Sequence, residues 1–241
     1  MIIKTIKLIL ATLLILIIIC IPLSIYLVRF NNNSFIGRNI KKQVINDPGL
    51  VRILNLNEPG DGRYIYLDSA VPSVSVSIYS IDAKPYDERV KLWMGDIMHS
   101  TVNKEIGEIF EGDINYGKTE LLTNENLEEI YKLVKSTSKS DVYIIFTGSY
   151  AEKPSSVGLV IQRDAIFIFN DAIELLSERG YVKDLLEKTT IMHEWGHLLG
   201  LEHINYSNCI MNEMAEVYDN PPVGKNLPIK YCWEELNIIR N

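Results

Sequence analysis

One stretch of eleven residues constrains the fold of this chain more than any other feature. It reads HEWGHLLGLEH and holds His193, His197 and His203, three of only four histidines. Residues four apart lie one turn apart on the same face of an α-helix, so His193 and His197 can bind one metal ion. On a continuous helix His203 would lie about 280° around from His193 and about 9 Å beyond His197. The helix must therefore stop before His203, and Gly200 stands where a left-handed residue can end it.

The same stretch carries the groups that a catalytic zinc site needs. Three neutral imidazoles that bind one Zn²⁺ ion leave an open coordination position, where the ion makes water more acidic and polarises a carbonyl group. Glu194 follows the first histidine and can act as the general base that moves a proton from this water to the leaving amine. We therefore expect one catalytic zinc ion bound by His193, His197 and His203, with Glu194 as the catalytic residue of peptide-bond hydrolysis. The alternatives are a buried helix that contains histidines by chance and a catalytically inactive, zinc-stabilised binding domain at the cell surface.

The amino-terminal end of the chain has the composition of a membrane-spanning helix. Residues 8–28 carry no charge and are dominated by Leu and Ile, and a helix of this length spans about 32 Å. We expect residues 1–29 to form an uncleaved, single-pass anchor; a cleaved signal peptide is the alternative. The flanking charges do not decide the orientation, but long domains are often exported, so we expect the remainder outside the cytoplasm. An intracellular peptidase that faces the membrane is the competing interpretation.

Charge and cysteine content exclude some classes of function. Residues 36–241 carry 21 Lys and Arg against 31 Asp and Glu, a net charge of −10. A domain this acidic repels a polyphosphate, so we expect no nucleic-acid partner. Three cysteines are too few for a disulfide-rich scaffold. The expected partners are a peptide or protein substrate and, through the apolar helix, a membrane; the sequence does not indicate an oligomeric state.

The remaining sequence predicts one α/β domain behind a linker. Residues 30–63 are rich in Asn, Gly and Pro, which is typical of a stalk with turns, and residues 44–56 within it suit a short strand or a short helix. Residues 64–241 form the expected catalytic domain. The alternation VSVSIYSI predicts a half-buried strand, and residues 87–110 predict a helix that is broken at Gly95 or Gly107. A turn is expected at 179–180. The expected strands are 74–81, 141–147, 157–161 and 165–169, and the expected helices are 124–135, 181–199 and 233–240.

The eleven residues resemble the HExxHxxGxxH signature of the metzincin zinc metallopeptidases. These enzymes also have a methionine turn beneath the zinc, and Met211 in NCIMN fits that position. The resemblance implies an α/β fold of the α+β type, with a twisted mixed sheet, an active-site helix and a small C-terminal subdomain. It also implies that Gly200 permits the turn, that Met211 forms the floor of the site, and that the substrate pairs with an edge strand, either 157–161 or 165–169.

Within this group the chain most resembles the archaemetzincins, which bind a second, structural zinc through four cysteines. Cys209 and Cys232 occupy two of those positions, but Ile204 and Glu235 occupy the other two. The resemblance therefore implies no second, structural zinc ion here. Cys209 and Cys232 form a disulfide if the domain is exported, or remain buried thiols if it is not.

Overall fold

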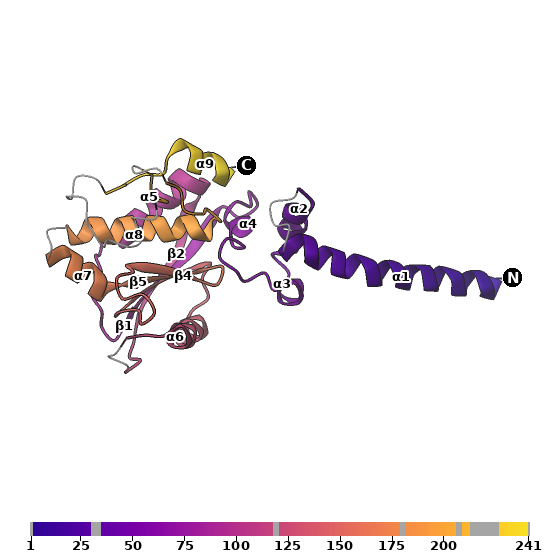
Figure 1. The fold of residues 1–241 in the computed structure, drawn as a ribbon, viewed down its shortest axis with the longest axis horizontal. Coiled ribbons are helices and arrows are strands. Elements are labelled where there is room, and N and C mark those ends of the chain that lie inside the picture. Colours follow the sequence, from indigo (N-terminus) through magenta and orange to yellow (C-terminus); the bar gives the residue numbers. More distant parts are fainter. Residues whose placement is uncertain are drawn as a thin grey trace. The chain divides into compact units, whose positions relative to one another are not determined.

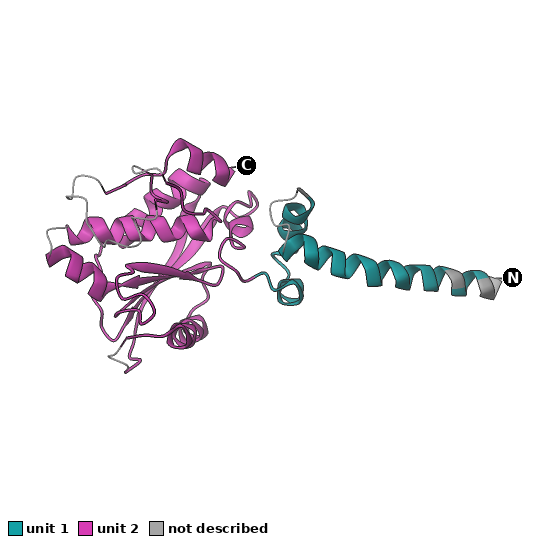
Figure 2. Cartoon of the chain, viewed as in Figure 1, with its two compact units in different colours: residues 1–56 teal, residues 57–241 magenta. Residues whose placement is uncertain are grey.

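A computed structural model describes residues 2–29, 35–117, 121–178, 182–205, 209–212 and 227–240. The chain divides into two compact units, residues 1–56 and residues 57–241, which Figure 2 shows in teal and magenta. The second unit contains the three histidines. It begins at Asn57, seven residues before the expected start of the catalytic domain at residue 64.

The first unit consists of α1 (Ile2–Arg29), α2 (Phe35–Val44) and α3 (Pro48–Leu54). In α1 the 25 residues Thr5–Arg29 have a mean hydropathy of 3.1, and among the described residues this is the one helix long and apolar enough to cross a membrane. The helix α2 lies where the sequence predicts only a stalk with turns, whereas α3 is the helix that was one of the two alternatives for residues 44–56. The sequence NDPG begins α3 because the Asp47 carboxylate accepts hydrogen bonds from two amides of the first turn and Pro48 occupies its first position.

The second unit is built on a five-stranded mixed sheet in the order β2-β1-β3-β5-β4. β4 runs antiparallel to β5, and the other neighbouring strands are parallel. The helices α5, α8 and α9 lie on one face of the sheet, and α6 lies on the opposite face (Figure 1). The strands are β1 (Ser73–Ile81), β2 (Glu105–Ile114), β3 (Val142–Thr147), β4 (Gly158–Ile161) and β5 (Ala165–Phe169). The helices are α4 (Arg63–Tyr66), α5 (Val90–Val102), α6 (Asn124–Thr137), α7 (Asn170–Glu178), α8 (Lys183–Leu198) and α9 (Trp233–Arg240).

The strand β1 is buried on both faces, although its sequence predicts one polar face. It lies between β2 and β3 in a sheet that carries helices on both sides, so its serine side chains also point into the interior. Their hydroxyl groups are satisfied locally. The Ser77 hydroxyl is 2.8 and 2.7 Å from those of Ser138 and Ser140, and the Ser80 hydroxyl donates to the carbonyl oxygen of Lys84. The strand β1 therefore lacks the exposed polar face that its sequence predicts, and its buried serines form hydrogen bonds inside the protein.

The prediction of a broken helix over residues 87–110 is wrong. The helix α5 continues through Gly95. Gly107 lies in β2, a strand that the sequence did not predict. β2 is an edge strand with mostly exposed side chains, so its sequence lacks the apolar alternation that marks a half-buried strand. A Cβ atom on Gly107 would lie 2.9 Å from the Ser73 hydroxyl oxygen, so glycine allows β2 to approach β1.

Three helices lie close to their expected positions. In α6 the Thr123 side chain and the Asn126 side chain form a capping box, and the apolar face of the helix is buried. α8 ends at Leu198, one residue before its expected end, and α9 matches its expected range. The helix α7 was not expected. The turn expected at 179–180 lies outside the described residues.

Candidate metal centre

The helix α8 holds two of the three histidines in a fixed orientation because its other faces are buried. Trp195 is fully buried, and its indole N–H donates to the Thr101 hydroxyl of α5 at 3.0 Å. The Tyr66 ring packs on the same indole with 4.9 Å between the ring centres. These contacts prevent rotation of α8, so His193 and His197 must project together from the face that remains.

The helix ends through glycine, as the histidine spacing requires. Gly200 has φ +78°, a left-handed conformation that glycine adopts without steric cost. Its N–H donates to the carbonyl of His197, and the N–H of Leu201 donates to the carbonyl of Gly196, both at 2.9 Å. This pair of bonds is the Schellman arrangement of a helix end. The chain then reverses and brings His203 back toward the other two histidines.

The three imidazole rings meet at one point. The Nε2 atoms of His193 and His197 are 3.2 Å apart, and the Nε2 atom of His203 is 3.1 Å from each of them. A circle through the three nitrogens has a radius of about 1.8 Å, whereas zinc–nitrogen bonds measure about 2.0–2.1 Å. The spacing of the three nitrogens therefore fits one zinc ion, which all three imidazoles could bind together.

Two backbone carbonyl groups determine which nitrogen carries the proton in the imidazole rings of His193 and His197. The Nδ1 atom of His193 is 2.7 Å from the carbonyl oxygen of Ile210, and that of His197 is 2.9 Å from the carbonyl oxygen of Leu201. A carbonyl oxygen only accepts, so each Nδ1 carries the proton and each Nε2 keeps its lone pair. Burial, together with the nearby His197, lowers the pKa of His193 to about 3. The buried ring is therefore neutral at physiological pH.

Met211 packs against α8 at Gly196, the residue before His197. It is fully buried, and a Cβ atom on Gly196 would lie 2.2 Å from its sulfur atom. The N–H of Ile204 donates to the carbonyl of Met211 at 2.9 Å, which joins the segment after His203 to the methionine. Because Gly196 has no side chain, the Met211 thioether can approach the helix backbone. The motif leaves this position unspecified, so the sequence does not indicate this role.

Glu194 is buried beside the edge of the sheet. A Cβ atom on Gly158, the first residue of β4, would lie 2.7 Å from the Glu194 Oε1 atom. β4 is the last strand in the sheet order, and β5 lies between β3 and β4. Of the two candidate edge strands, only β4 therefore has an outer edge, and the carboxylate of Glu194 lies against its beginning. The contribution of Gly158 was missed because it joins two segments far apart in the chain.

A disulfide and a carboxylate hold the methionine turn against α9. Cys209 and Cys232 are disulfide-bonded, which decides between the two alternatives left by the sequence. The buried Glu235 carboxylate accepts hydrogen bonds from the amide of Met211 at 2.8 Å and from the amide of Cys232 at 2.5 Å. The disulfide and the Glu235 carboxylate thus connect the methionine turn to the beginning of α9.

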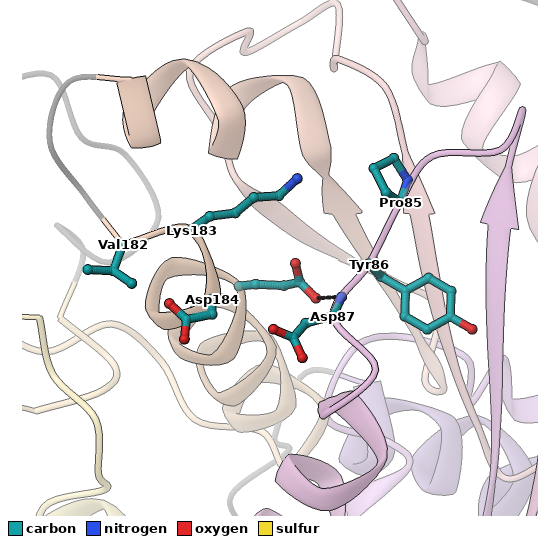
Figure 3. Close-up of a pocket in the computed structure, with 7 residues that line it drawn as sticks. Pro85, Tyr86, Asp87, Val182, Lys183 and Asp184 are labelled. Carbon is teal, nitrogen blue, oxygen red and sulfur yellow. Dashed lines mark hydrogen bonds between the residues drawn. The ribbon is translucent and has the colours of Figure 1, made fainter.

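A concave surface lies near the beginning of α8, and Glu187, one of its lining residues, precedes His193 by six residues. It is an open cavity of about 450 Å³ lined by residues of α8 and of the segment before α5 (Figure 3). The buried Glu187 carboxylate accepts from the amide N–H of Asp87 at 2.8 Å. Arg89 forms ion pairs with both Asp87 and Asp184. Burial raises the pKa of Glu187 to about 7, so this cavity contains a carboxyl group that titrates near neutral pH.

Comparison with known proteins identifies the fold. No protein-family model matches the sequence, and no curated protein matches it either. Among solved structures, archaemetzincin from Methanopyrus kandleri is similar with a TM-score of 0.52 and 14% sequence identity. The match covers 70% of this chain and 94% of the solved chain. This chain has the archaemetzincin fold.

The archaemetzincin fold agrees with the twisted mixed sheet and active-site helix expected from the sequence. A zinc-dependent peptidase from Methanocorpusculum labreanum is also similar, with a TM-score of 0.47, 12% identity, and coverage of 68% of this chain and 99% of that chain. At 14% identity the similarity to the Methanopyrus kandleri structure shows the fold alone, and the roles of individual side chains rest on the geometry described above.

Proposed function

We propose that this protein is a zinc-dependent metallopeptidase that hydrolyses peptide bonds in peptide or protein substrates. The observation that carries the proposal is the cluster of three Nε2 atoms within 3.2 Å of one another, two of them on rings whose Nδ1 protons are held by backbone carbonyls. Neutral imidazoles that converge on one point are zinc ligands of an open site. The archaemetzincin fold supports the same class of activity.

In this proposal, His193, His197 and His203 hold the ion, and Glu194 is the catalytic base. When bound, zinc supplies Lewis-acid chemistry, which makes water more acidic and polarises the scissile carbonyl. Glu194 accepts a proton from the attacking water and delivers it to the leaving amine. Its carboxylate is confined between α8 and the start of β4, so it stays close to any chain that pairs with that strand.

Gly200 and Met211 shape the site without touching the reacting atoms. Gly200 provides the left-handed residue that ends α8 and lets His203 return. Met211 fills the space below Gly196 with an apolar thioether, which excludes water beneath the ligands. The structure of the turn therefore sets the spacing of the three ligands.

We also propose that α1 anchors the protein in a membrane as a single-pass helix, with residues 57–241 on the extracytoplasmic side. The length and apolar composition of α1 support the anchor. The Cys209–Cys232 disulfide supports an oxidising compartment, because such bonds are rare in the cytosol. The orientation is tested in a variant in which Glu178 is replaced by cysteine and Cys20 by serine. A membrane-impermeant thiol reagent should label this variant in intact cells. Labelling only after lysis would refute the extracytoplasmic orientation.

The activity is tested with the full chain in detergent. Zinc content and cleavage of a diverse peptide library are measured for the parent, for Glu194→Gln and for Glu202→Gln. Glu202 is an exposed carboxylate of the same motif and serves as the matched control. We expect one zinc ion per chain in all three, and cleavage by the parent and Glu202→Gln alone.

Two results would contradict the proposal. Zinc binding without cleavage by the parent would favour a zinc-stabilised binding domain. A folded parent that binds no zinc would remove the basis for both functions.

A further inference from the structure

Residues 58–66, here called the brace, lie in or next to the expected linker yet pack against the metal centre. The brace begins with a tight turn in which the amide of Asp61 donates to the carbonyl of Glu58 at 3.0 Å. The Asp61 carboxylate accepts from the amide of Glu58 at 3.1 Å. Pro59 and Gly60, the latter with φ +88°, occupy the central positions, as in a type II turn. This turn presents the bare backbone of Gly60 at its tip.

Gly60 contacts the glycine that ends α8. A Cβ atom on Gly60 would lie 2.9 Å from the Cα atom of Gly200 and 3.8 Å from the carbonyl oxygen of His197. Ordinary van der Waals contacts of a Cβ atom lie at 3.4–4 Å. The two backbones can therefore meet only because position 60 has no side chain.

The brace is held in place by contacts that do not involve the histidines. The guanidinium of Arg63 donates to the carbonyls of Ile238 and Ile239 in the last turn of α9, at 3.0 and 3.1 Å. The Tyr66 hydroxyl contacts the carbonyls of Asp141 at 3.0 Å and Arg163 at 3.2 Å. Because α4, the second half of the brace, is attached to the surrounding fold just after the turn, Gly60 presents a rigid surface to Gly200.

We propose that Gly60 is a positioning residue for the zinc ligand His203; this inference rests on the zinc site proposed above. His193 and His197 are held by α8, whereas His203 is exposed and reaches the site through the turn at Gly200. The brace fixes the path of that turn. A side chain at position 60 would need at least about 0.5 Å of displacement to reach ordinary contact, which exceeds the ±0.2 Å over which metal–ligand distances vary.

The test compares two glycine-to-alanine variants of the full chain. Gly117 has φ +72°, close to that of Gly60, but its nearest neighbour for a Cβ atom is a side-chain oxygen at an ordinary 3.8 Å. Gly117→Ala therefore introduces the same backbone strain without the contact. Zinc affinity is measured on metal-free protein by competition with a chromogenic chelator, and folding by circular dichroism.

We expect Gly60→Ala to bind zinc at least tenfold more weakly than the parent while remaining folded, and Gly117→Ala to stay within twofold. Equal affinity of Gly60→Ala and the parent would overturn the inference, and so would an equal loss in both glycine variants. If Gly60→Ala does not fold, Arg63→Gln, which loosens the brace from α9, decides the question. A loss of at least threefold in folded Arg63→Gln supports the inference, and unchanged affinity overturns it. A folded parent without zinc affinity would instead refute the proposed function.

Discussion

The buried carboxyl group of Glu187 gives the clearest quantitative prediction. Burial raises its pKa from 4.5 to about 7. A carboxyl group whose pKa is higher in the folded state binds its proton more tightly there, so its contribution to stability is present at low pH and is lost as the pH rises from 4.5 through 7. At about 1.4 kcal/mol per pKa unit, the charged form costs the folded state about 3 kcal/mol above pH 7.

Replacing this carboxyl by an amide should remove the pH-dependent cost. In Glu187→Gln the side-chain oxygen still accepts from the Asp87 amide, and the group never ionises. We expect the variant to be more stable than the parent by up to about 3 kcal/mol at pH 8.5, and the difference to shrink toward zero near pH 4.5. All other carboxyl groups titrate in both proteins and cancel in the comparison.

Urea unfolding followed by circular dichroism, at pH 5 and pH 8.5 in the same detergent, measures this difference. Glu178→Gln is the control, because Glu178 is an exposed carboxylate on the neighbouring helix α7. The control should change stability equally at both pH values. A Glu187→Gln variant whose advantage over the parent does not grow between pH 5 and pH 8.5 would refute the assignment of a buried, proton-binding carboxyl.

Three further predictions concern the site and its supports. Gly158→Ala places a methyl group against the Glu194 carboxylate, so the rate of peptide cleavage should fall at least tenfold while zinc affinity stays within twofold of the parent. In the control Gly95→Ala the added atom meets only Ile106, at 3.9 Å, so both the cleavage rate and the zinc affinity should stay unchanged. Replacing Cys209 and Cys232 by serine should lower the free energy of unfolding by about 3 kcal/mol, because the bond closes a loop with a sequence separation of 23; equal urea midpoints would contradict this. Thr123→Ala removes the capping box of α6 and should cost about 1 kcal/mol in thermal unfolding without changing zinc affinity.

Local features could be predicted because their cause lies within a few residues. The ligand pair on α8 follows from a spacing of four, and the left-handed conformation of Gly200 follows from the requirement that His203 return. The buried strands β3 and β5 follow from continuous apolar runs. In each case the chain carries enough information in one segment to exclude other local structures.

Other local patterns were ambiguous because the same residues suit two structures. NDPG is a turn signal, but Asp followed by Pro is also a helix start, and the structure uses it to begin α3. The edge strand β2 exposes most of its side chains, so nothing in its sequence required burial. Packing against the rest of the domain decides which of the two structures forms, and a short segment of sequence contains no information about that packing.

By itself, the sequence determined the candidate metal centre: three imidazoles and one carboxylate in a segment that ends a helix and turns back. Only the tertiary structure decided what holds them. Gly60 meets Gly200, Gly158 meets Glu194, and Glu235 binds the amide of Met211. Each contact joins segments that lie far apart in the sequence, so no local pattern predicts it, and it requires the tertiary arrangement of these segments. The proposed metal ligands could therefore be identified from one segment, whereas the residues that contact them from distant segments could be identified only in the folded structure.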